Sequence, residues 1–126
     1  MTGLGNIILI HLHGTLSANA KGVIHVPLQG ATLVEVAACG SNVNDAKLTI
    51  GPAADTDGYL VTGAIGDSSV PAVFNAANFD GALSDPLKIS APHLGKDAVL
   101  HWSLDFDGAG GTAAADVDIQ VTLLEG

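Results

Sequence analysis

Hydrophobic and polar residues alternate with a period of two along most of the chain. Near the N-terminus, Ile8, Ile10 and Leu12 share one phase, and Leu9, His11 and His13 share the other. Alternation of this kind places successive side chains on opposite faces of an extended strand. Similar runs recur at 23–28, 32–39, 46–50, 59–65, 70–74, 87–90, 100–106 and 115–123. The pattern therefore predicts eight or nine short strands.

Turn-forming residues separate these runs, as at Asp57-Gly58, Asp80-Gly81 and Asp107–Gly111. No segment shows convincing helical periodicity. Because apolar residues occupy every second position, each sheet is expected to be antiparallel with one face in the core. The sequence thus predicts an all-β fold: a single domain over residues 1–126, built as an antiparallel two-sheet β-sandwich of jelly-roll type with about eight strands. An immunoglobulin-like topology is the nearest alternative.

The composition adds a feature that an ordinary sandwich does not need. Hydrophobic residues make up 48% of the chain and charged residues 13%, and the mean hydropathy is +0.42. A surface so poor in charge suggests that other subunits cover part of it. Apolar residues in the outward phase of their strands are the candidates for such subunit contacts: Leu9, Leu33, Ala37, Leu60, Ala64 and Leu124.

The net charge excludes several classes of partner. The chain carries −9 with only four basic residues, all of them lysine, so neither nucleic acid nor an anionic membrane is expected as a partner. No apolar stretch approaches the roughly 20 residues of a membrane-spanning helix. No basic residue precedes the apolar run at 7–12, so no signal peptide is expected. Residues 1–5 are expected to form a flexible N-terminal arm.

Three histidines are candidate metal ligands. His11 and His13 would point to the same face of their strand, and a hairpin closed by Ser17–Lys21 would place His25 opposite His13. Three imidazoles on one face suit a zinc-class ion. The alternative, that they are ordinary polar-face or interface residues, is the one we adopt, because no carboxylate is expected beside them. The spacing from Gly5 to the two histidines also matches the opening of a cupin metal motif, but the glutamate of that motif is missing.

Asp105 and Asp107 precede a glycine-rich turn and are candidate calcium ligands. The spacing does not fit an EF-hand, and an Asp-Gly pair between two strands is the usual signal of a hairpin. No nucleophile elbow, phosphate-binding loop or zinc-protease motif is present. Neither an enzyme nor a bound cofactor is therefore expected.

Two segments, Tyr59–Asn75 and Leu104–Gly126, resemble small structural proteins of tailed bacteriophages, in particular capsid decoration (cement) proteins. The resemblance lies in short strands rich in alanine and glycine, Asp-Gly turns and few charges. It implies a β-sandwich that oligomerises, often as a homotrimer, and binds the major capsid protein on the outside of the virion, where it stabilises the shell. The alternative function is a carbohydrate- or receptor-binding module of a fibre, tail or surface array.

Overall fold

The computed structural model describes residues 5–26, 30–52, 59–66, 71–75, 93–95 and 98–125. Within these ranges the chain forms strands and connecting turns, with no helix that could cross a membrane. The strands are β1 (Gly5–Thr15), β2 (Ala20–His25), β3 (Ala31–Cys39), β4 (Lys47–Pro52), β5 (Leu60–Ala64), β6 (Ala72–Asn75), β7 (His93–Leu94), β8 (Val99–Asp105) and β9 (Ala115–Glu125). The prediction of an all-β fold is confirmed.

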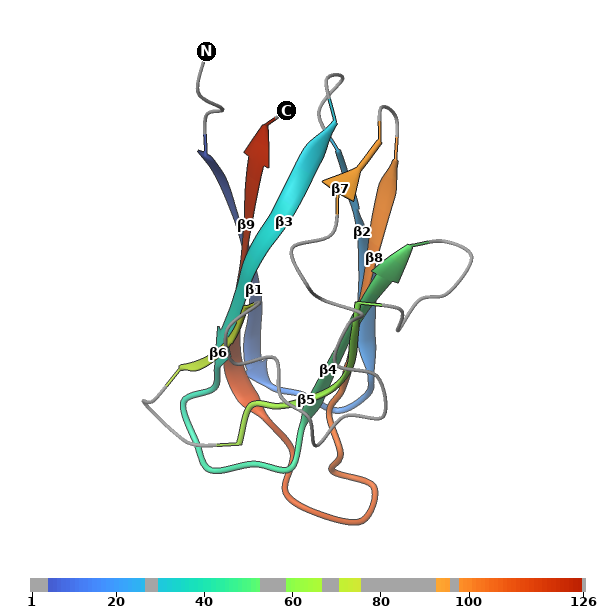
Figure 1. Ribbon diagram of the computed structural model, residues 1–126. Helices are drawn as coiled ribbons and strands as arrows, with labels where there is room; N and C mark the ends of the chain where they lie inside the picture. Colours follow the sequence, from blue (N-terminus) through green and yellow to red (C-terminus); the bar gives the residue numbers. More distant parts are fainter. Residues whose placement is uncertain are drawn as a thin grey trace.

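The strands form two antiparallel sheets. Sheet A has the order β1-β9-β3-β6, with β7 also paired to β3, and sheet B has the order β2-β8-β4-β5. Figure 1 shows the two sheets facing each other, with the start of β1 and the end of β9 at the same end of the molecule. The predicted two-sheet antiparallel sandwich is thus confirmed.

Strand pairs are nested along the chain: β1 with β9, β2 with β8, β3 with β6, and β4 with β5. This order is compatible with the jelly-roll type, which stays a prediction. The expected hairpin between the first two strands is wrong, because they belong to different sheets. The amide of Leu16 donates to the carbonyl of Ala114 at 2.9 Å, rather than pairing with Gly22. Residues 16–19 therefore carry the chain from one sheet to the other.

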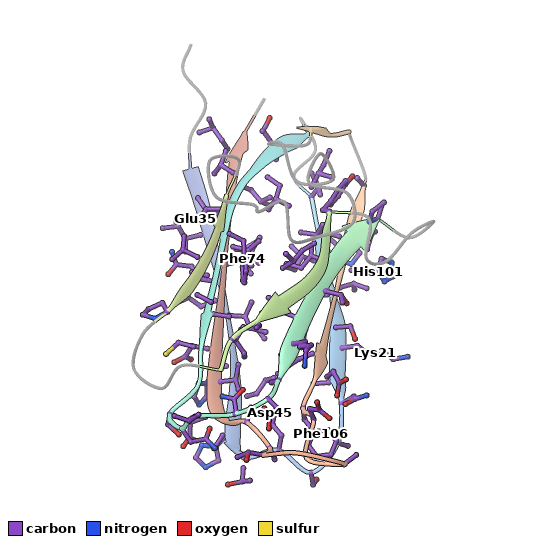
Figure 2. The ribbon with its side chains drawn as sticks, turned by 60° about the horizontal axis from the view of Figure 1, so that its bottom comes forward. Lys21, Glu35, Asp45, Phe74, His101 and Phe106 are labelled. Atoms are coloured by element: carbon purple, nitrogen blue, oxygen red, sulfur yellow. The ribbon has the colours of Figure 1, made fainter. Side chains whose placement is uncertain are left out.

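The core lies between the sheets and takes side chains from both. In β9 every second residue from Val117 to Leu123 is fully buried, and β8 supplies Leu100, Trp102 and Leu104. Phe74 of β6 points into the space between the sheets (Figure 2) and packs against the buried cluster. The largest fully buried side chains are Leu33, Leu48, Ile50, Leu60, Ile65, Leu100, Leu104, Ile119, Leu123, Val36 and Val117.

Two of the six residues predicted to face outward are buried in this core. Leu33 is 1% exposed and Leu60 is fully buried, so the expectation that they contact other subunits is wrong. In each strand an extra residue interrupts the pairing: Leu33 and Glu35 of β3 oppose consecutive residues of β9, and Leu60 and Gly63 of β5 oppose residues only two apart on β4. A bulge of one residue reverses the phase of a strand from that point.

Other strand boundaries differ by a few residues from the predicted runs. The run at 23–28 corresponds to β2, which begins earlier and ends at His25, and the two-residue β7 has no predicted counterpart. Gly5, the last residue of the expected arm, is the first of β1. The rest of that arm and the run at 87–90 lie outside the described residues.

A substitution at Gly22 can test how closely the strands of sheet B pack against the indole of Trp102. Gly22 lies directly opposite Trp102, and a Cβ atom at Gly22 would lie 2.7 Å from Nε1 of the indole. The Gly22→Ala substitution is expected to lower the free energy of unfolding by about 1–3 kcal/mol, the usual cost of overpacking. Urea denaturation followed by the fluorescence of Trp102, the single tryptophan, measures this change.

Gly110→Ala is the matched control, because a Cβ atom at Gly110 would meet nothing within 4 Å. This variant should differ from the parent chain by less than about 1 kcal/mol. A Gly22→Ala variant as stable as the parent would contradict the close approach of strand and indole.

Candidate functional site

The outer face of sheet A is apolar where the first residues of β1 lie beside the last residues of β9. Ile7 is 61% exposed, Leu9 is 71% exposed and Leu124 is 41% exposed. Leu9 lies opposite Gln120 of β9, which in turn lies opposite Ala37 of β3. These residues, together with Cys39, define what we call the outer face of sheet A. A shallow hollow of about 250 Å³ on this face is lined by Leu9, Ala37, Ala38, Cys39, Pro71, Asp118 and Gln120.

The outer face of sheet B is different in character. Lys21 and His101 point away from that sheet (Figure 2), and Lys47 of β4 is exposed. The described part of sheet A contains no lysine. Lysine is strongly preferred at surfaces that stay in water and is depleted in interfaces. The two faces of the sandwich are therefore suited to different surroundings.

Strand β1 forms one edge of sheet A and pairs only with β9 among the described strands. Its residues from Gly5 to Leu12 pair with β9 in unbroken register, and they include no lysine, proline or acidic residue. Natural edge strands are commonly protected by such residues, or by bulges. The first eight residues of β1 lack these protections, so their free edge is suited to pairing with another strand.

Two histidines of β1 lie beside two carboxylates of β9. Nδ1 of His11 lies 2.6 Å from Oδ1 of Asp118, its cross-strand partner. Nδ1 of His13 lies 4.0 Å from Oδ1 of Asp116. The two imidazole ring centres are 6.1 Å apart, as expected for residues two apart on one strand face. The pairing of the first and last strands thus assembles a cluster of four titratable groups.

A bulge fixes the position of Asp116 within this cluster. The register between β1 and β9 shifts after Leu12, and Gly14 and Asp116 both adopt positive φ angles, of 74° and 48°. The amide of Gly14 donates to Oδ1 of Asp116 at 2.8 Å, and Oγ of Ser41 donates to Oδ2 at 3.2 Å. These two bonds, together with the nearby His13 and His11, hold the pKa of Asp116 below its ordinary value.

The third predicted histidine does not join this group. His25 lies on β2 in sheet B, opposite Val99, so the expected set of three histidines on one face is wrong. Asp116 takes the place that was expected for His25: among the described residues, the side chains that could hold a metal ion together are His11, His13 and Asp116. Their ligand atoms all lie within 4.8 Å of one another.

The predicted calcium ligands have other roles. Oδ1 of Asp105 accepts a hydrogen bond from the amide of Asp107 at 3.1 Å, which closes a local turn. Oδ2 of Asp107 lies 3.8 Å from Nζ of Lys47. Asp105 and Asp107 do not form a metal-ligating group with a third side chain of the described residues. Asp105 thus forms an Asx-turn, and Asp107 faces Lys47 of β4.

The remaining subunit-contact candidates are divided between the sheets. Leu9, Ala37 and Leu124 all belong to the outer face of sheet A. Ala64 is exposed on β5, at the edge of sheet B and opposite Lys47. Cys39 is partly covered, and its Sγ donates to the carbonyl of Gly40 at 3.4 Å. Three of the six candidates therefore share one surface.

An open groove of about 500 Å³ lies along β2 and β8, and it bears on the alternative function of carbohydrate binding. It is lined by Lys21, Gly22, Val23, His101, Trp102 and Ser103. Sugar sites on β-sandwiches commonly offer an exposed aromatic ring, but Trp102 is only 8% exposed and packs in the core. The groove therefore does not favour the carbohydrate-binding alternative.

Comparison with known proteins gives one structural similarity. No family model matches the chain, and no curated protein matches its sequence. A chain in the solved structure of the cyanophage Pam1 capsid asymmetric unit aligns with 98% of this chain and 87% of its own length, at 15% identity and a TM-score of 0.48. What this chain does has therefore to be inferred from its own residues.

Sequence reasoning missed the contact between the histidines and Asp116 and Asp118, although the sequence contains a signal for it. His11 and His13 alternate with apolar residues, and Asp116 and Asp118 alternate in the same way on the last strand. Opposite charges on facing strands stabilise a sheet, so matching alternations mark two strands as candidate neighbours. The exposure of Ile7 was not predicted, because the alternation in this strand was assigned from Ile8, Ile10 and Leu12.

The hydrogen bonds to Asp116 predict a measurable dependence on pH. Removing the Ser41 donor by Ser41→Ala should raise the pKa of Asp116 toward its ordinary value. Titration of the Asp116 carboxyl carbon by NMR, with chelator present, measures this shift. Ser103→Ala, on β8 in sheet B, is the matched control and should leave the titration unchanged.

The same hydrogen bonds determine how the stability of the fold changes with pH. A carboxyl whose pKa is lower in the folded chain stabilises the fold above its unfolded pKa, about 3.9. This contribution is lost as the pH falls through the folded pKa. The parent chain should therefore lose stability more steeply than Asp116→Asn below about pH 4. Equal slopes for the two chains would contradict the assignment.

Proposed function

We propose that this chain is a structural virion protein that forms oligomers and binds the outside of a capsid shell, which it stabilises. The observation that carries the proposal is the outer face of sheet A, where exposed Ile7, Leu9 and Leu124 adjoin the unprotected edge of β1. An apolar face beside an open strand edge is costly in water and favourable in an assembly.

A second copy of this chain is the occupant that we propose for the edge of β1. The edge offers backbone donors and acceptors, and its residues from Gly5 to Leu12 include no lysine, aspartate or glutamate whose charge would have to be buried. Strand addition at such an edge supplies affinity through main-chain hydrogen bonds. The lysines of sheet B, by contrast, suit a face that stays in water.

A homotrimer is the oligomer that we propose. When the edge of β1 in one copy pairs with a strand edge other than β1 in the next, the contact is heterologous, and such contacts form a closed ring when the rotation between copies allows it. The resemblance of Tyr59–Asn75 and Leu104–Gly126 to decoration proteins also favours a trimer. In this assembly the protein acts by binding and not as an enzyme.

Stabilisation of the shell would follow from linkage. A protein that binds the major capsid protein across subunit joints interacts with the assembled shell and not with separated subunits. Binding to one state alone shifts the equilibrium toward that state. The location of the chain is then the surface of the virion.

Leu9→Asp tests the oligomer. A carboxylate in place of an apolar side chain at a subunit contact should weaken association about tenfold or more, since 1.4 kcal/mol corresponds to a factor of ten. Because Leu9 is mostly exposed in the protomer, the stability of the fold should change little. Native mass spectrometry at micromolar concentration should find a trimer for the parent chain and smaller species for the variant.

Val23→Asp is the matched control, because Val23 is also an exposed apolar residue on an edge strand, but in sheet B. It should leave the oligomer unchanged. A parent chain that is monomeric at these concentrations would overturn the oligomer. Adding the chain to shells assembled from the major capsid protein of the same virus tests the partner, and thermal melting of these shells tests the stabilising role. An unchanged melting temperature would overturn that role.

A further inference from the structure

We propose that His11, His13 and Asp116 bind a divalent transition-metal ion of the zinc class on the outer face of sheet A. The three side chains come from β1 and β9, and their ligand atoms all lie within 4.8 Å of one another. The site is separate from the structural role proposed above and does not depend on it.

The types of ligand favour zinc-class ions over calcium or magnesium. Two imidazole nitrogens and one carboxylate oxygen form a mixed N/O set of the kind that binds zinc, nickel or copper. Calcium requires six to eight oxygen ligands, and this cluster offers too few. Three protein ligands leave one tetrahedral position open for a water molecule.

Asp116 is already held in place for this role. Its carboxylate receives one hydrogen bond on each oxygen, from the amide of Gly14 and from Oγ of Ser41. Each oxygen keeps a further lone pair that can bind a cation. The bonds that fix Asp116 at its positive φ angle therefore provide an anchored, negatively charged ligand at neutral pH.

Asp118 is placed to orient His11. The short contact between Asp118 and Nδ1 of His11 fixes which ring nitrogen carries the proton, and it leaves Nε2 as the nitrogen that can bind an ion. Carboxylates commonly orient metal-binding histidines in this way, and they raise the basicity of the ring. Asp118 is thus a positioning residue rather than a ligand.

Only small movements are needed to complete the geometry. Tetrahedral zinc ligands at about 2.1 Å from the ion lie roughly 3.4 Å apart, so separations of up to 4.8 Å have to shorten by up to about 1.4 Å. The His13 side chain is 92% exposed, so its ring can rotate toward Asp116 without disturbing the packing. The bulge keeps the anchored carboxylate in place while the rings move.

Zinc binding to the untagged full-length chain tests the site. Isothermal titration with zinc chloride should show one ion per chain for the parent. His13→Ala and His11→Ala should each weaken binding by at least a hundredfold. Asp118→Ala should weaken it about tenfold, as is typical for the loss of a partner that orients a ligand. Imidazole NMR resonances of His11 and His13 should shift with zinc, and those of His25 should not.

His25→Ala and His101→Ala are the matched controls, because both residues lie on sheet B, away from the site. They should leave the affinity unchanged. Zinc that binds His13→Ala as tightly as the parent, or no binding by the parent at millimolar zinc, would overturn the proposal. Leu9→Asp should still bind one zinc ion, so the site and the oligomer can fail separately.

Discussion

The rest of the structure depends on the antiparallel pairing of β1 with β9. It joins residues 5–15 to residues 115–125, so nearly the whole chain has to close before it forms. β9 lies between β1 and β3, and its inward side chains from Val117 to Leu123 are fully buried. This pairing joins the two terminal strands in one sheet, leaves the other edge of β1 without a partner among the described strands, and brings His11 and His13 to Asp116 and Asp118. The candidate functions of the chain all lie along these two strands.

The sequence predicts the strands and their faces well, but not their neighbours. Period-two alternation depends only on adjacent residues, so the outward phase of Leu9, His11 and His13 is correct. Which strand lies beside β1 depends instead on the packing of the whole sandwich. The short connection at 16–19 favours a hairpin locally, yet the chain uses it to cross between sheets. The error over His25 follows directly from that false hairpin.

Bulges account for the other errors. At Leu33 and Leu60 the local alternation is regular enough to assign a face, but one extra residue in β3 and in β5 reverses the phase. A bulge appears in the sequence as an ordinary strand residue, because its cause is the fit to the neighbouring strand. The same kind of irregularity near Gly14 is useful, since it turns the amide of Gly14 toward Asp116. Bulges in this chain thus both hide core residues and build the candidate site.

The apolar excess of the chain divides into two parts once the faces are assigned. The larger part is the core between the sheets, which any sandwich of this size requires. The smaller part is exposed: Ile7, Leu9 and Leu124 lie on sheet A beside the edge of β1 that has no partner among the described strands, while Val23 lies on sheet B and Val43 outside the strands. Sheet B carries exposed Lys21 and Lys47, and sheet A carries Asp116 and Asp118 at the start of β9, so the exposed apolar residues and these two carboxylates of the β1–β9 pair lie toward opposite ends of it. An apolar patch confined to one end of one sheet face suggests a defined side for assembly, whereas apolar residues scattered over the whole surface would not.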